Sequence, residues 1–420
     1  MRICFVQPNT AYQVQENKLA FALTFPQIIL NLELEEEYCI FVDGMMNSTL
    51  GDFLIANKIS HVFISCITST FPRAVNLAKQ AKEIGCITVL GGIFATISAY
   101  KIVEHYDCFN YIISGGINRS FLSMLESTDT IGTKRIINIP RQDVFDKPLS
   151  PIMLNSSFTS IFSEDLFVCY ELGCGCLYNC SFCTLRQSFG CTYRSRNPQI
   201  VQFDLTNLSK RWKKLKLIDD DIFQAQNILA HLDLSQFKQI IIETRINHID
   251  EAFVRLCKNK GITHIITGIE AFDDSILSNL NKAAGPNWCS HINSVIDLCN
   301  KHSIVLRPVV MLNPPGSTLK NVIDLLSYTK EWQPENNVEL LMSLYTPHPG
   351  TVFPKGVFFS NDLSLFDHLH PVFMPNGLEA DIEKVLNIYE QIVSQTSSQA
   401  FNPPLEIPTQ FINEYIPFFK

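Results

Sequence analysis

Short apolar runs alternate with longer amphipathic stretches over the first 130 residues. Five runs rich in β-branched and aromatic residues have the length of buried strands, and they cover 2–7, 38–43, 61–66, 88–90 and 111–114. Between the third and fourth runs, Ala74, Leu77, Ala78 and Ala81 recur at helical spacing. Strands that alternate with helices predict a doubly wound parallel sheet, in which ligands bind beyond the carboxyl ends of the strands.

The rhythm stops at about residue 130 and starts again at Phe167. Residues 131–165 carry Pro140, Pro148 and Pro151 among polar residues, so they are predicted to form a linker. Six further strands are expected at 167–171, 215–218, 240–244, 264–268, 305–311 and 340–344. Each is followed by a helical pattern, which favours a partial (βα)6 barrel of the TIM type over a second open sheet.

The last segment, residues 353–420, is expected to be a short helical extension. Its one amphipathic helix has an apolar face made by Ile382, Val385, Leu386, Tyr389, Ile392 and Val393. The aromatic tail beyond it, with Phe411 and Phe419, is expected to pack against the rest. The predicted domains are therefore 1–130, 131–165, 166–352 and 353–420.

Composition describes a folded globular chain and narrows its partners. Of the 420 residues, 46% are hydrophobic and 18% are charged, which excludes a disordered or coiled-coil protein. The net charge of −8 disfavours nucleic acid as a partner. No run approaches the roughly 18 apolar residues of a membrane helix. Fourteen cysteines without a secretory leader predict a reducing cytoplasm.

Five of the fourteen cysteines gather within 18 residues, and they are Cys174, Cys176, Cys180, Cys183 and Cys191. Three of them form the pattern Cys-x3-Cys-x2-Cys, at 176, 180 and 183. Three thiolates from one loop can bind three irons of a [4Fe–4S] cluster and leave the fourth iron open. A structural zinc site needs four protein ligands, and no nearby histidine has a familiar spacing. The pattern therefore favours an iron–sulfur cluster over zinc.

This pattern resembles the signature of the radical S-adenosylmethionine (SAM) superfamily, Cys-x3-Cys-x-aromatic-Cys, with Phe182 as the aromatic residue. The resemblance implies that the open iron binds SAM and that Phe182 packs against its adenine. It also implies that an electron from the cluster cleaves SAM to a 5′-deoxyadenosyl radical, chemistry that belongs to the cofactors.

Landmarks downstream of the cysteines resemble the branch of this superfamily that carries a cobalamin-binding domain. They are Asp220–Phe223, Glu243–Arg245, Gly268–Glu270, Pro314–Thr318 and Thr346–Thr351, each after one predicted strand. The resemblance places Glu270 near the SAM ribose, and charge makes Arg245 a candidate partner of the SAM carboxylate. Two alternatives stay open: Glu270 and Arg245 form a structural ion pair, and Asp220 or Asp221 only caps the following helix.

The first domain resembles the cobalamin-binding domain that precedes such barrels. Candidate cobalamin contacts follow its third and fourth strands, and they are Ser65, Thr68, Ser69, Gly91, Gly92 and Thr96. No Asp-x-His-x-x-Gly motif occurs, so cobalamin is expected to bind without a histidine ligand from the usual loop. Gly115-Gly116 after the fifth strand lacks the acidic residue that the family often has. A domain that keeps the fold and has lost the cofactor is the second interpretation.

Cys174 stands where family members commonly have arginine, and Cys191 closes the cysteine-rich stretch. Both are open to three interpretations: spare cluster ligands, redox-active thiols, or packing residues.

The two halves together predict a cobalamin-dependent radical SAM methyltransferase that acts at an unactivated carbon. Its cofactors would be a [4Fe–4S] cluster, SAM and cobalamin, its substrate a small molecule or peptide, and its electron donor a flavodoxin or ferredoxin. The first alternative is a radical SAM cyclase, rearrangement or oxidation enzyme that does not methylate. The second is a non-catalytic cobalamin or iron–sulfur binding module, which would not need the three cysteines and Glu270 intact.

Overall fold

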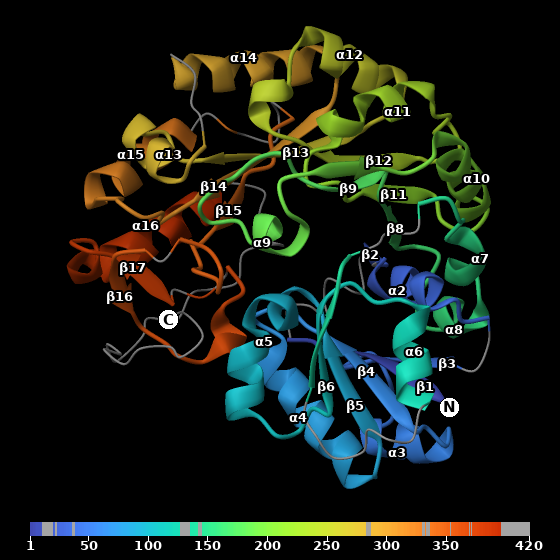
Figure 1. The fold of residues 1–420 in the computed structure, drawn as a ribbon. Coiled ribbons are helices and arrows are strands. Elements are labelled where there is room, and N and C mark those ends of the chain that lie inside the picture. The colour runs from blue at the N-terminus through green and yellow to red at the C-terminus, as the bar shows by residue number, and fades with distance from the viewer. Residues whose placement is uncertain are drawn as a thin grey trace.

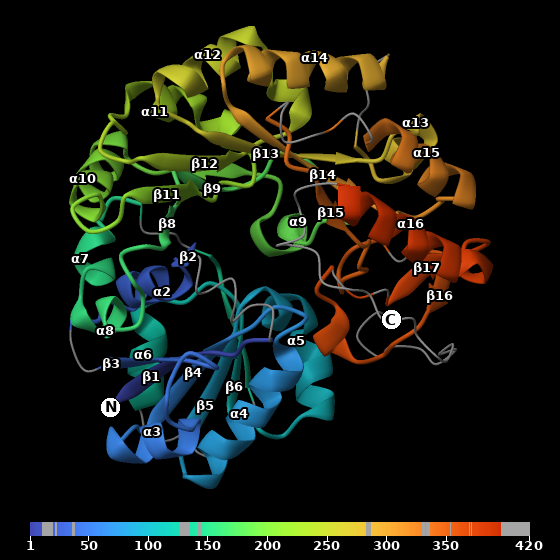
Figure 2. The same ribbon diagram turned by 180° about the vertical axis from the view of Figure 1, so that it is seen from behind.

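The computed structural model describes residues 1–10, 20–21, 23–35, 38–126, 135–141, 145–282, 287–329, 332, 337–352, 354–368, 370 and 372–395. Within these ranges the chain forms two units that face each other (Figures 1 and 2). A blue sheet with its helices forms one unit, and a green-to-orange arc of strands and outer helices forms the other. The short helix α9 (Leu185–Phe189) lies between the two sheets in both views.

The first sheet has six parallel strands in the order β3-β1-β4-β5-β6-β7. These are β1 (Ile3–Gln7), β3 (Tyr38–Val42), β4 (His61–Ser65), β5 (Ile87–Gly91), β6 (Tyr111–Gly115) and β7 (Arg135–Ile139). Its helices are α2 (Thr24–Leu32), α3 (Leu50–Ala56), α4 (Phe71–Glu83), α5 (Ile93–His105) and α6 (Arg119–Glu126). The four residues at helical spacing, Ala74 to Ala81, lie on α4 and are buried. The predicted doubly wound sheet is confirmed.

Two strands depart from the predicted pattern. Strand β7 lies inside the segment predicted as a linker and extends the first sheet beyond β6. Strand β2 (Ala20–Phe21) leaves the first unit and pairs with β8 of the second, with Ala20 opposite Phe167. The two units therefore share backbone hydrogen bonds as well as a connecting chain.

The second sheet is a partial barrel of parallel strands in the order β15-β14-β13-β12-β11-β8, with β2 at its end. These are β8 (Phe167–Tyr170), β11 (Lys214–Leu217), β12 (Gln239–Glu243), β13 (His264–Glu270), β14 (Val305–Met311) and β15 (Leu341–Ser343). Its outer helices are α10 (Pro198–Leu208), α11 (Gln226–His231), α12 (Glu251–Asn259), α13 (Asp274–Asn279), α14 (Trp288–Lys301) and α15 (Leu319–Thr329). The partial barrel is also confirmed.

Between the units, the short helices α7 (Ser150–Met153) and α8 (Ser156–Thr159) follow β7. The fully buried carboxylate of Asp204 on α10 accepts hydrogen bonds from the Leu149 and Ser150 amides, both at 2.8 Å. The Tyr170 hydroxyl donates to the same carboxylate at 2.7 Å. This segment is thus fastened to the barrel.

The C-terminal extension contains a two-stranded ribbon and the predicted amphipathic helix. The ribbon is β16 (Gly356–Phe358) with β17 (Phe373–Pro375), and the helix is α16 (Ile382–Gln395). Val385, Leu386 and Tyr389 are buried as expected, while the side chains of Ile392 and Val393 and the aromatic tail lie outside the described residues. Within the described ranges no helix combines the length and apolar character that a membrane crossing demands.

The segment after β15 runs between the two units. Gly350 has φ +81°, and a Cβ there would lie 2.8 Å from Ile97 Cγ2 of α5 and 3.2 Å from Gln187 Cγ of α9. A side chain would therefore be strained and crowded at this point. Glycine lets the chain pass between α5 and α9.

Candidate active site

The three patterned cysteines lie on a loop closed by a short hairpin. We call residues 176–192 the cluster loop; it connects β9 (Gly173–Gly175) to β10 (Tyr193–Ser195), which pair antiparallel. Gly175 has φ +96°, and a Cβ there would lie 2.1 Å from the Thr192 carbonyl oxygen. Only glycine fits where the two strands of the hairpin approach at the first cysteine.

Asp219, just after β11, holds the base of this hairpin. Its buried carboxylate accepts hydrogen bonds from the Leu172 and Gly173 amides at 2.8 and 2.9 Å and from the Tyr193 hydroxyl at 2.6 Å. Burial raises the pKa of Asp219 to about 7, although the bond from Tyr193 acts in the opposite direction. Asp219, one residue before the landmark Asp220–Phe223, was not singled out from the sequence, yet it shapes the cluster loop.

Cys176, Cys180 and Cys183 are all half-buried, and the Cys183 amide donates to the Cys180 carbonyl at 3.2 Å. Among the described residues, no three His, Cys, Asp or Glu side chains converge on a point where one metal ion would bind. A tetrahedral zinc ion with Zn–S bonds of about 2.3 Å holds its sulfur ligands about 3.8 Å apart. A cubane cluster binds each thiolate through a different iron and so spaces them more widely. The three cysteines stay candidate ligands of a cluster because of their spacing along the chain.

Two side chains donate hydrogen bonds to these thiol sulfurs. Arg245 Nη1 lies 3.3 Å from Cys180 Sγ, and Gln224 Nε2 lies 3.6 Å from Cys176 Sγ. The Arg245 guanidinium also stacks 3.9 Å above the Tyr178 ring. Hydrogen bonds to cluster sulfurs stabilise negative charge on them. Arg245, predicted to partner the SAM carboxylate, is thus engaged with the cluster loop itself.

A polar chain behind Tyr178 fixes this arrangement. The Tyr178 hydroxyl lies 2.7 Å from His248 Nε2, and His248 Nδ1 lies 3.1 Å from the Asp221 carboxylate. Phe223 stacks on the His248 ring, with the ring centroids 4.3 Å apart. Burial opposes ionisation of Asp221, but hydrogen bonds from His248 and Thr244 outweigh it and lower its pKa.

The carboxylate of Asp221 does not cap the helix that follows. Asp221 precedes the 3-10 turn Ile222–Ala225 and makes no side-chain capping bond there, so the helix-cap alternative is wrong for it. Asp220 is exposed, yet desolvation by the surrounding protein, with Glu243 and Glu171 nearby, raises its pKa to about 7.

Glu270 is buried at the end of β13 and is paired with a lysine. Its Oε1 lies 2.6 Å from Lys282 Nζ, which also donates to the Gly268 carbonyl at 2.6 Å. A Cβ at Gly268 would lie 2.1 Å from Glu270 Oε1, so the carboxylate folds back over this glycine. The alternative of an ion pair between Glu270 and Arg245 is wrong, because each has another partner. The sequence analysis missed Lys282, since nothing in its spacing marks it.

The turn that carries Lys282 also holds the cluster loop. The Ser181 amide donates to the Leu280 carbonyl at 2.9 Å, and the Asn281 side chain donates to the Asn179 carbonyl at 2.6 Å. Phe182, the predicted adenine contact, is half-buried and packs against the hydrophobic core. The cluster loop is therefore held by the turn that carries Lys282 and by the side chain of Arg245.

The candidate cobalamin residues lie at the carboxyl ends of β4 and β5. We call the loops after β4, β5 and β6 the first-sheet edge. Thr68 and Ser69 are buried, with Thr68 7% exposed. Gly92 has φ +98°, and a Cβ there would lie 2.4 Å from the Cys66 carbonyl oxygen and 3.1 Å from Ser65 Oγ. Gly91 faces open space, as a close approach of a ligand requires.

Thr96 has partners within the protein. Its hydroxyl donates to the Gly92 carbonyl at 2.9 Å and accepts from the Gly115 amide at 3.2 Å. Thr96 thus ties the loops after β5 and β6 together. Thr68 instead contacts the other unit: its Oγ1 lies 3.1 Å from His348 Nδ1.

The two other cysteines of the cysteine-rich stretch, Cys174 and Cys191, lie in different environments. Cys174 is buried in β9 opposite Arg194. Cys191 is exposed, and its thiol donates to the Leu177 carbonyl at 3.0 Å. Cys191 therefore supports the turn of the cluster loop.

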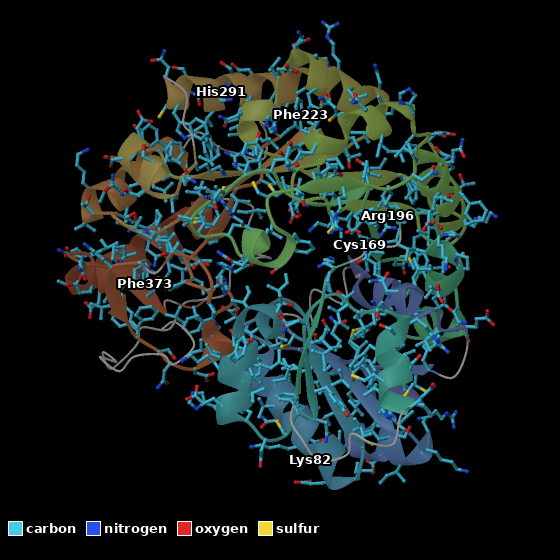
Figure 3. The ribbon with its side chains drawn as sticks, viewed as in Figure 1. Lys82, Cys169, Arg196, Phe223, His291 and Phe373 are labelled. Atoms are coloured by element: carbon cyan, nitrogen blue, oxygen red, sulfur yellow. The ribbon has the colours of Figure 1, made fainter. Side chains whose placement is uncertain are left out.

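The units also meet at Glu171, at the end of β8. Its carboxylate accepts a hydrogen bond from Arg196 at 3.0 Å and another from Gln27 of α2. Figure 3 labels Arg196 and Cys169 on the side of the barrel that faces the first unit. Burial raises the pKa of Glu171, and Arg196 counteracts the shift.

Comparisons with known proteins agree with this architecture. No family model matches the chain. The chain is 23% identical over 361 residues to bacteriochlorophyllide d C-8(2)-methyltransferase of Chlorobaculum tepidum, covering 79% of this chain and 77% of that protein. It is 22% identical to the C-12(1)-methyltransferase of the same organism, covering 92% and 86%.

Among solved structures, the radical SAM methyltransferase TsrM from Kitasatospora setae, with tryptophan substrate and a SAM analogue bound, superimposes with a TM-score of 0.65. The match covers 97% of this chain and 91% of that one at 14% identity. This likeness shows a shared fold. With the curated relatives, it confirms the resemblance to cobalamin-dependent radical SAM methyltransferases.

Proposed function

We propose that this protein is a cobalamin-dependent radical SAM methyltransferase acting at an unactivated carbon of a small molecule. One observation carries the proposal: segment 348–352 contacts both candidate cofactor sites. The Val352 amide donates to the Ser181 carbonyl of the cluster loop at 3.0 Å, and His348 contacts Thr68 at the first-sheet edge. The two contacts lie only four positions apart in the chain, which supports a short distance between the two sites, as methyl transfer between cofactors requires.

The relatives support the same reaction class. The two curated relatives methylate bacteriochlorophyllide d at different positions. A second structure of TsrM, at a TM-score of 0.62 and 15% identity, holds cobalamin and a [4Fe–4S] cluster. We extend these cofactors to this chain because its own residues fit them.

In this proposal, Cys176, Cys180 and Cys183 bind the [4Fe–4S] cluster. When bound, the cluster and SAM supply a carbon radical, and cobalamin carries the methyl group. Arg245 and Gln224 donate to two of the thiolates and stabilise their charge.

Phe182 would contact the adenine of SAM. Glu270 would reach the ribose through Oε2, since Lys282 holds Oε1. The cobalamin site would be lined by Ser65, Thr68, Ser69, Gly91 and Gly92. The Thr96 hydroxyl would instead hold the loops after β5 and β6 together.

We also propose an electron donor and a cellular compartment for the reaction. A flavodoxin or ferredoxin would supply the electron, and the fourteen cysteines favour a reducing cytoplasm. Which small molecule is methylated would follow from trials with candidate substrates.

Anaerobic reconstitution with iron, sulfide, cobalamin, SAM and a low-potential reductant tests the proposal. We expect both 5′-deoxyadenosine and S-adenosylhomocysteine by mass spectrometry, because one SAM gives the radical and another the methyl group. Cys183→Ala should yield neither product. Formation of 5′-deoxyadenosine without any S-adenosylhomocysteine, in the presence of accepted substrate, would favour the non-methylating alternative.

A further inference from the structure

Three segments far apart in the sequence meet in one hydrogen-bond chain between the units. Thr68, after β4, lies 3.1 Å from His348 Nδ1; His348 Nε2 lies 3.0 Å from His368 Nε2. His368 Nδ1 lies 3.2 Å from the Leu344 carbonyl oxygen, and the Leu344 amide donates to the His368 carbonyl at 2.8 Å. The chain connects the first-sheet edge, the loop after β15 and the C-terminal extension.

The chemistry of its ends fixes the direction of every bond. The Leu344 carbonyl can only accept, so His368 Nδ1 carries the proton. A neutral His368 then has a lone pair on Nε2, which His348 must meet with an N–H on its own Nε2. His348 Nδ1 is therefore an acceptor, and the Thr68 hydroxyl donates to it.

We propose that His348 and His368 are positioning residues for cobalamin: they hold Thr68 through a chain of fixed direction and leave its hydroxyl able only to accept from a ligand. Assigning this loop to cobalamin rests on the proposed function. The matching ligand groups are primary amide N–H donors, which line the rim of a corrin. His368 also has a backbone φ of +67°, which is uncommon for a residue other than glycine.

The chain requires both rings to be neutral, and the surroundings favour this. Desolvation, aided by His368, lowers the pKa of His348 to about 3, and desolvation lowers the pKa of His368. Asp367 and Glu270 act against the shift at His368, but Asp367 binds His370 and Glu270 binds Lys282.

A further proton would place N–H groups on both Nε2 atoms, 3.0 Å apart, and break the chain. Because both pKa values are lowered, the rings stay neutral and the chain stays intact below the ordinary histidine pKa of about 6.5; it is lost only as pH falls towards the lowered values, about 3 for His348.

A competing arrangement of the two histidines, a metal site, can be distinguished from the hydrogen-bond chain by experiment. Two imidazoles that face each other, each with Nδ1 directed at an oxygen, could instead bind a metal ion through both Nε2 atoms. That arrangement needs the proton of His348 on Nδ1. The two interpretations therefore predict opposite tautomers for His348 and the same tautomer for His368.

The tautomers can be read in the full-length protein without any cofactor. We expect 15N-histidine NMR, assigned with His348→Gln and His368→Gln, to show Nε2–H for His348 and Nδ1–H for His368 at pH 7.5. A proton on Nδ1 of His348, or one equivalent of bound metal lost in both variants, would overturn the proposal. This measurement does not depend on whether the protein binds cobalamin.

Cobalamin affinity tests the positioning role, with hydroxocobalamin as the probe. His348→Phe should weaken binding about 10-fold, the equivalent of one hydrogen bond. His348→Gln should restore much of it, because the amide can accept from Thr68 and donate to His368. The double variant with Thr68→Val should bind no worse than His348→Phe alone. His231→Gln, on the outer helix α11, is the matched control.

The pH profile separates positioning from simple packing. Wild-type affinity should stay constant from pH 7.5 to 5, because the lowered pKa values keep both rings neutral, and should fall only towards pH 3. His348→Phe should lack that fall. Wild-type affinity in His348→Phe, at any pH, would overturn the proposal even if the tautomers were as expected. If the wild-type protein binds no cobalamin while the tautomers hold, the proposed function fails, and the positioning role for cobalamin fails with it.

Discussion

The cluster loop and the first-sheet edge are built in different ways. The cluster loop is held by groups that follow three barrel strands: Asp219 and Gln224 after β11, Arg245 after β12, and the turn at Lys282 after β13 and α13. The first-sheet edge has short hydroxyl side chains and glycines, and its own bonds run between neighbouring loops or across to His348. The cluster loop would need thiolate sulfur atoms as ligands, whereas the first-sheet edge would need open space that matches the shape of a ligand.

This difference explains how the two sites respond to substitution. A thiolate ligand has no substitute among other residue types, so the cluster loop should fail at single positions. At the first-sheet edge, backbone groups would make much of the contact with a ligand. Substitution of a single side chain there should therefore have a smaller effect. Four substitutions, ordered by the size of the expected effect, test that contrast.

Cys183→Ala should abolish the cluster. A cluster held by only two thiolates of the loop is not expected to survive, so the iron content, the visible absorption and both SAM-derived products should be lost. Cys191→Ser is the matched control, because this exposed thiol lies on the same loop and only donates to Leu177. Equal iron loss in the two variants would mean that Cys191 is a ligand.

Lys282→Met should destabilise the barrel by about 3–5 kcal/mol, since it leaves the buried Glu270 carboxylate without its partner. Chemical denaturation followed by circular dichroism measures the free energy of unfolding. Adding Glu270→Gln should recover part of the loss. Lys320→Met removes the exposed pair with Asp324 and should cost about 1 kcal/mol or less. Equal losses at the two lysines would contradict the role of Lys282.

Arg245→Met should lower the reduction potential of the cluster by an amount on the order of tens of millivolts, because it removes a charged donor to Cys180. Gln224→Leu should have a smaller effect in the same direction, since its neutral donor lies farther from Cys176. A redox titration followed by electron paramagnetic resonance measures both. If the reduction potential were unchanged and the affinity for SAM were lost, Arg245 would instead be a partner of the SAM carboxylate, as the sequence predicted.

Thr96→Val should cost about 1 kcal/mol of stability, because it removes the bond to Gly92 and the acceptor of the Gly115 amide. Thr96→Ser keeps the hydroxyl and is the control. Cobalamin affinity should change little, since the hydroxyl has partners within the protein. A large loss of affinity with unchanged stability would make Thr96 a direct contact and weaken the contrast between the two sites.

Much of the fold could be predicted because buried parallel strands are strongly apolar. The strand at 305–311, for example, was predicted with the bounds that the structure has. The two missed strands carried weak signals: β7 runs directly into Pro140 within a polar stretch that contains further prolines, and β2 has two residues. Their pairing is decided by distant strands, which local pattern does not contain.

The site follows the same logic. The cysteines could be found because cluster ligation imposes their spacing along one loop. Lys282 and His368 could not, because they meet Glu270 and His348 only through the fold. His348 lies in a landmark that the sequence did single out, but its partner is 20 positions away.

Strand β2 has a consequence for how the molecule can be divided. Cutting the chain at residue 166 would remove β2 and leave β8 with a row of unpaired amides and carbonyls along one side. Exposed edges of this kind pair with other chains and promote aggregation. An isolated barrel should therefore be less soluble than the whole protein, and two segments that look like separable modules should be expressed as one piece.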